Sequence, residues 1–140
     1  MMLRATTFCL ALAALTVPAF AEAADTPGPA TGRARVFEMR TYYTVPGRLD
    51  ALNARFRDHT CRIFQKHGME IVGFWTPQGE KDKLVYILAY PSRDAARASW
   101  DAFRADPEWK KAQAESEKDG KIVSRVESVF LDPTDYSAIK

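Results

Sequence analysis

Apolar and polar positions alternate along residues 35–44, which is the period expected of a β-strand. One face of this strand carries Phe37, Met39, Thr41 and Tyr43, and the other carries Val36, Glu38, Arg40 and Tyr42. Pro46 and Gly47 then mark a turn, and residues 48–67 show the helical period with one apolar stripe. Gly68 follows in the position where a left-handed residue commonly ends a helix.

The rest of the chain predicts two more strands, a second helical region and a last strand. Residues 69–76 and 83–90 read as a hairpin with a polar tip. Ser92 is a plausible N-cap, and Asp106 with Pro107 restarts a helix that Gly120 closes. Residues 121–131 form the last apolar strand. The order β-α-β-β-α-β is typical of an α+β, ferredoxin-like sandwich.

Such a sandwich has helices on one face of its sheet and leaves the other face uncovered. A domain of this size cannot expose a whole face of aromatic and aliphatic groups without inviting association. A second copy is the simplest cover, so the pattern predicts a homodimer whose two sheets form a dimeric α/β barrel.

The N-terminus reads as a targeting segment and not as part of the fold. Arg4 precedes the apolar residues 8–20, and small residues near Ala21 and Ala23 offer two cleavage sites. The apolar run is shorter than the roughly 20 residues that a membrane span needs. We therefore expect a signal peptide at residues 1–23, a flexible segment at 24–33 and one domain at 34–140. The mature protein is expected to be secreted or periplasmic, without stable membrane insertion; an uncleaved anchor is the alternative.

Charge and cysteine content narrow the function classes. The chain has 20 basic and 18 acidic residues, and no basic cluster is interleaved with aromatics, so nucleic acid is not an expected partner. Cys9 lies in the predicted signal peptide, which leaves Cys61 as the only cysteine of the mature chain. No intrachain disulfide is then available, and Cys61 is expected to be packed and inert, or else free for an intermolecular bridge.

The two histidines do not form a metal site in this pattern. His59 and His67 stand eight residues apart on one predicted helix, about 12 Å along its axis, so they cannot share an ion. No motif indicates haem or another cofactor, and we predict none. His59, at the edge of the apolar stripe, is the candidate acid–base catalyst. The alternative is a histidine that only fixes the helix through a hydrogen bond.

The charged face of the first strand is the other candidate site. We expect Glu38, Arg40 and Tyr42 to face the second sheet of the dimer, because the more apolar set should pack on the helices. The last strand adjoins the first in this topology and brings Arg125 and Glu127, and the hairpin adds Trp75 and Tyr86. These residues are predicted to line a cavity. They would either form an ion-pair network that fixes the dimer, or bind an anionic or carbonyl group through Arg40 while Glu38 or His59 moves a proton.

Six segments in the same order resemble the NIPSNAP family, within the dimeric α/β-barrel superfamily: "FEMRTYYTVPGRLD", "RFRDHT", "KHGMEIVGFWT", "LVYILAY", "DPEWKK" and "LDPTDYS". The resemblance covers nearly the whole domain and implies a ferredoxin-like protomer that pairs into a barrel. It leaves the chemistry open, since other branches of the superfamily include cofactor-free monooxygenases, isomerases and haem-handling enzymes.

Three functions follow from these observations. The first is an exported module that binds a small, partly apolar ligand in the barrel cavity. The second is a cofactor-free monooxygenase or isomerase acting on a small organic molecule. The third is a dimeric protein-interaction module whose outer surface matters.

Overall fold

The structure is a computed structural model that describes residues 35–140. The predicted signal peptide, its cleavage sites and the segment 24–33 lie outside the described residues. Four strands form one antiparallel sheet: β1 (Val36–Thr44), β2 (Glu70–Trp75), β3 (Lys83–Tyr90) and β4 (Val123–Leu131). Their order in the sheet is β2-β3-β1-β4, so the first strand lies in the middle beside the last. The predicted α+β, ferredoxin-like topology is confirmed.

The connection from β1 to β2 is one helical rod with an irregular centre. It consists of α1 (Leu49–Arg55), the π-helical turn η1 (Phe56–Thr60) and α2 (Cys61–Lys66). The hydroxyl of Thr60 donates to the carbonyl of Arg55, five residues earlier, at 3.2 Å. The sequence pattern predicted a regular helix here, and the structure instead inserts a single π turn, a feature that occurs mostly as a bulge within α-helices.

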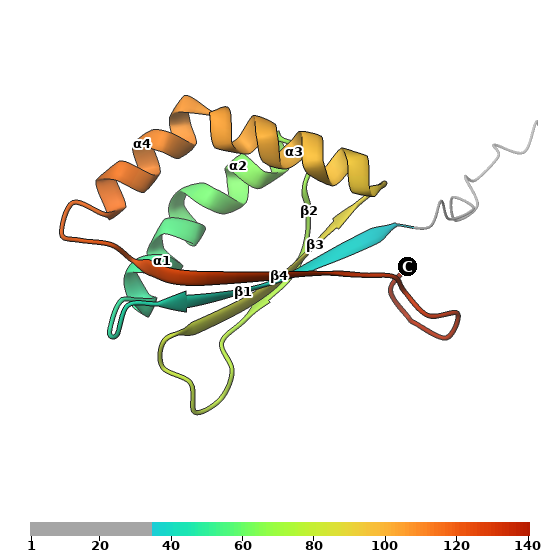
Figure 1. Cartoon of the computed structure of the whole chain (residues 1–140), viewed down its shortest axis with the longest axis horizontal. Coiled ribbons are helices and arrows are strands. Elements are labelled where there is room, and N and C mark those ends of the chain that lie inside the picture. Colours follow the sequence, from blue (N-terminus) through green and yellow to red (C-terminus); the bar gives the residue numbers. More distant parts are fainter. Residues whose placement is uncertain (1–34) are drawn as a thin grey trace, which may run out of the picture. The chain divides into compact units, whose positions relative to one another are not determined.

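The second helical region consists of α3 (Arg93–Ala105) and α4 (Pro107–Ser116). Its predicted caps are present: Ser92 accepts from the amide of Ala95 at 3.1 Å, and Asp106 accepts from the amide of Glu108 at 2.8 Å. Figure 1 shows these helices on the same side of the sheet as α1 and α2.

The core fills the space between the helices and this side of the sheet. Phe56 on η1 has edge or tilted contacts with four other rings, at centroid distances of 5.3 to 6.0 Å: Tyr42, Phe64, Phe74 and Tyr86. Full burial of each such side chain contributes about 1.5–3 kcal/mol. The aromatic centre of the core therefore joins the first helical rod to β1, β2 and β3.

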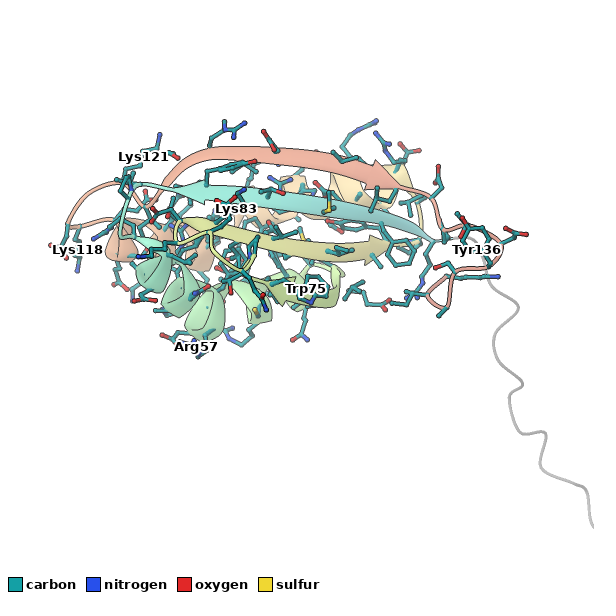
Figure 2. The ribbon with its side chains drawn as sticks, turned by 90° about the horizontal axis from the view of Figure 1, so that it is seen from below. Arg57, Trp75, Lys83, Lys118, Lys121 and Tyr136 are labelled. Carbon is teal, nitrogen blue, oxygen red and sulfur yellow. The ribbon has the colours of Figure 1, made fainter. Side chains whose placement is uncertain are left out.

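The two faces of β1 are the reverse of the sequence expectation. Glu38 bonds to Trp100 on α3, and Tyr42 packs on Phe56, so the set Val36, Glu38, Arg40 and Tyr42 faces the helices. Phe37, Met39, Thr41 and Tyr43 therefore lie on the uncovered face, the side from which Figure 2 views the sheet. The reversal is physically possible because the helix side supplies hydrogen-bond donors that satisfy the buried charge.

Residues 132–140 fold back at one end of the uncovered face. The guanidinium of Arg35 donates to the backbone carbonyl of Lys140 at 2.7 Å, and it also pairs with Glu70. A pocket of about 350 Å³ lies between this tail and the sheet, with Phe37, Ile87 and Ile139 in its lining. Among the described residues, the helices are all too short or too polar to cross a membrane.

Candidate ligand-binding site

Glu38 is a deeply buried charged residue, with 2% of its surface exposed. Its carboxylate accepts four hydrogen bonds. Oε1 receives one from Arg40 and one from Ser128, both at 2.6 Å. Oε2 receives one from the indole of Trp100 at 2.6 Å and one from the hydroxyl of Tyr90 at 2.9 Å. The four donors come from β1, β4, α3 and β3, so Glu38 joins these elements.

These donors decide the ionisation of Glu38. Burial alone would raise the pKa of the carboxyl group, but the hydrogen bonds from Ser128 and Trp100 and the charge of Arg40 lower it, and the net pKa is below the ordinary value. Burial, together with the same carboxylate, raises the pKa of the Tyr90 phenol. Glu38 is therefore a stable anion, and Tyr90 a stable hydrogen-bond donor, at neutral pH.

Arg40 completes the buried pair and extends toward solvent. Its Nη1 donates to Glu38, and its guanidinium lies over the Trp100 ring, 4.2 Å from the ring centre. Burial would lower the pKa of Arg40, but Tyr86, Tyr42 and Glu38 raise it, so the group stays charged. Its buried Nε has no hydrogen-bond partner among the described residues. Arg40 thus keeps bonding capacity beyond its contact with Glu38.

A pocket of about 240 Å³ adjoins this pair, between α3 and the β1–β4 side of the sheet. Its lining consists of Glu38, Arg40, Arg93, Arg97, Trp100, Arg104 and Phe130. The α3 members occupy positions i, i+4, i+7 and i+11, which bring side chains to one face of a helix. Sequence reasoning missed these arginines because it considered only the apolar stripe of α3. The spacing of Arg93, Arg97 and Arg104 around Trp100 was the signal that could have found them.

Tyr42 and Tyr86, which the sequence placed in the same cavity, lie instead in the aromatic core. Their rings are 5.3 Å apart, and Tyr86 is fully buried. Neither residue lines the pocket beside Glu38. They face the helices as Glu38 does, but they lie further along the sheet, beneath Phe56 of η1.

Trp75, Arg125 and Glu127 lie on the uncovered face of the sheet. Trp75 is 50% exposed, and its ring lies over the backbone of Gly73. Arg125 and Glu127 pair with one another, and the hydroxyl of Tyr43 donates to Glu127 at 2.9 Å. The predicted cavity is therefore divided between two faces of the sheet. Within one protomer, the charged side chains of β4 point to the uncovered face and those of β1 point to the helices. The two sets of charges therefore do not meet.

His59 lies neither in the pocket beside Glu38 nor on the uncovered face of the sheet. It is on η1 and half-buried, in a groove between η1 and α4 that Arg55, Asp58 and Glu115 also line. This groove and the Glu38 pocket have no lining residue in common. A catalytic role for His59 stays a prediction. His59 and Arg40 line different pockets of the protomer.

His67 and Cys61 have structural surroundings. His67 ends α2 and contacts the buried carboxylate of Asp106 at 2.7 Å, which ties α2 to the junction of α3 and α4. Cys61 is a free, half-buried thiol, and burial raises its pKa, which disfavours the reactive thiolate. Among residues 35–140, no group of three or more His, Cys, Asp or Glu side chains is placed to hold a metal ion.

The fold and the pocket together define a ferredoxin-like domain with a basic, part-aromatic pocket on the helix side of its sheet. The NIPSNAP family model matches residues 37–138, and the chain belongs to the NIPSNAP family. A comparison with curated proteins finds no match.

Solved structures share this fold. A NIPSNAP family protein of unknown function from Agrobacterium tumefaciens is 24% identical, with a TM-score of 0.68, over 77% of this chain and 96% of its own. An uncharacterised NIPSNAP domain protein from Burkholderia xenovorans is 24% identical, with a TM-score of 0.63, over 73% of this chain and 97% of its own. A candidate antibiotic biosynthesis monooxygenase from Chloroflexus aurantiacus is 16% identical, with a TM-score of 0.53, over 76% and 100% of the two chains. At these identities the likeness shows the fold alone.

Proposed function

We propose that this NIPSNAP protein is an exported, homodimeric module that binds a small organic molecule in the pocket lined by Glu38, Arg40 and Trp100. The site differs from the one expected from sequence, because it lies between the helices and the sheet of one protomer and not between two sheets.

One observation carries the proposal. A buried carboxylate and a largely buried guanidinium adjoin a pocket, and the guanidinium has only one side-chain hydrogen-bond partner among the described residues. Converging polar groups beside aromatic rings are the usual composition of a small-molecule site. Arg40 lines this hollow and its side chain is 18% exposed, so a group bound there can contact its guanidinium.

The same geometry favours binding over catalysis by Glu38. A general base is most effective when its pKa lies near the working pH. The four donors hold the pKa of Glu38 below the ordinary carboxyl value, which makes it a weak base at neutral pH. The cofactor-free monooxygenase or isomerase of the sequence analysis therefore lacks a suitable base at this pocket.

Titration with benzamide, benzoate, phenol and indole tests the proposal. Binding should shift the indole N–H resonance of Trp100 in proton–nitrogen NMR spectra, since Trp100 lines the pocket and its N–H donates to Glu38 beside it. The resonance is assigned with a Trp100→Phe protein. If none of these four compounds changes the Trp100 signal at millimolar concentration, the proposal is overturned.

A pair of neighbouring substitutions on β4 provides the matched control. Phe130 lines the pocket, whereas Val129 points to the uncovered face. Phe130→Ala should weaken binding of the probes severalfold, and Val129→Ala should leave it unchanged. Equal effects of the two variants would mean that the probes bind elsewhere.

A further inference from the structure

The pocket beside Glu38 carries an excess of positive charge. Four arginines and one glutamate line it, which gives a formal charge of +3 at the lining. Arg97 and Arg104 have exposed partners on α3 itself, Asp94 and Asp101. Such exposed pairs contribute little, and they leave other N–H groups of each guanidinium free to bind.

Two of the arginines are held in place by aromatic rings. Arg93 lies over Phe130, 3.7 Å from the ring centre, and Arg40 lies over Trp100 at 4.2 Å. Arg93 has no carboxylate partner among the described residues. Stacking limits the rotamers of a guanidinium while its N–H edge stays available for hydrogen bonds. The pocket therefore has prepositioned donors and few acceptors.

We infer that the ligand of this pocket is a small organic oxyanion, bound through a carboxylate or phosphate group by Arg40 and the arginines of α3. This inference rests on the proposed function, because it names the ligand class of the same pocket. An oxyanion accepts the bidentate hydrogen bonds that guanidinium groups donate best, and it neutralises charges that otherwise repel one another.

The geometry also limits the size and the position of the ligand. A volume of about 240 Å³ is below the usual range for drug-sized ligands, so the ligand is small. Glu38 repels the anionic group from the innermost end of the pocket. We expect the oxyanion to lie toward α3, with the rest of the ligand near Trp100 and Phe130.

The test measures how tightly the whole mature protein binds compounds of similar shape that differ in charge. Calorimetric titration with benzoate and phenyl phosphate should give binding at least tenfold tighter than titration with neutral benzamide or cationic benzylamine. The advantage of the anions should fall in 0.5 M NaCl, because salt screens exposed charges. The relative affinities of benzoate and phenyl phosphate distinguish a carboxylate from a phosphate ligand.

Two arginine variants separate specific contacts from net charge. Arg97→Gln removes a pocket arginine, and Arg57→Gln removes an exposed arginine of η1 that lies outside this pocket. Arg97→Gln should weaken benzoate binding about tenfold and leave benzamide binding unchanged, while Arg57→Gln should change neither. Equal binding of benzamide and benzoate would overturn the oxyanion inference and leave the pocket as a binding site. Absence of binding by all four probes would overturn both proposals.

Discussion

Glu38 shows that a buried charge can be stable when hydrogen-bond donors satisfy both of its carboxylate oxygens. Each oxygen of its carboxylate accepts two hydrogen bonds, and one of the donors is charged. A buried ion without such partners would cost several kcal/mol. The Glu38 side chain thus specifies where α3 and β4 lie relative to β1, in addition to forming one wall of the pocket.

Replacing this carboxylate should destabilise the domain in a pH-dependent way. Glu38→Gln leaves Arg40 without its buried counter-charge, and we expect a loss of about 3 kcal/mol at pH 7. Because the pKa of Glu38 in the folded protein lies below its ordinary value of 4.5, its contribution is present above that pH and is lost as the pH falls through the folded pKa.

Urea denaturation of both proteins at pH 7 and at stepwise lower pH measures this effect. The stability difference should be largest at pH 7 and should shrink as the pH falls below 4.5 and then through the lower pKa of the folded protein, where the wild-type carboxyl group takes up a proton. A difference that stays constant over this range would contradict the assigned ionisation of Glu38.

At this scale the sequence identified Glu38 and Arg40 as unusual, but not their surroundings. Strand alternation separates two faces and does not say which face meets the helices. The deciding contact is the bond from Trp100, which lies 62 residues further along the chain. The spacing of the α3 arginines places them on one helix face, but the sequence does not show that β1 and β4 supply the opposite wall of the pocket.

At the scale of elements, helix ends were the most predictable features. Ser92 and Asp106 have side chains that accept hydrogen bonds from first-turn amides, which is a local arrangement. The strands and their order followed from periodicity and turn residues in the same way. The sequence pattern did not distinguish the π-helical turn at residues 56–60 from the regular helix on either side of it.

The cap of α3 offers a direct test at this scale. Ser92→Ala removes the acceptor for the amide of Ala95 and should lower the free energy of unfolding by about 1 kcal/mol. Since α3 carries Arg93 and Arg97, the change should also weaken benzoate binding slightly by loosening the first turn.

Ser99→Ala is the matched control, because Ser99 lies inside the same helix, where alanine is favourable. Chemical denaturation of the two variants is the measurement. Equal stability of both would mean that the Ser92 cap contributes nothing to the domain.

At the scale of the whole molecule, the uncovered face of the sheet exposes apolar side chains that the described residues of one protomer do not cover. Val129 and Trp75 on this face are about half exposed, and Met39 and Ile87 are only partly buried. Contiguous apolar surface of this kind usually marks an interface. We propose that a second copy covers it, which retains the dimer expected from the sequence.

A charge in the middle of this face should separate the two copies. Ile87 lies between Met39 and Gly73, which are on the two neighbouring strands. The substitution Ile87→Lys should therefore convert the dimer to a monomer in sedimentation experiments. Ala102→Lys, on the exposed side of α3, should leave the dimer intact. A wild-type protein that sediments as a monomer at micromolar concentration would contradict the proposed dimer.

The position of β1 in the centre of the sheet has a consequence for the order of folding. Both of its neighbours, β3 and β4, are synthesised after it, and Ser128 lies 90 residues beyond the Glu38 that it contacts. Such distant pairings close large loops and form slowly compared with local helices. The sheet cannot be completed until almost the whole chain has emerged from the ribosome. For a protein that we propose to be exported, a sheet that forms late is compatible with threading of the unfolded chain through a membrane channel.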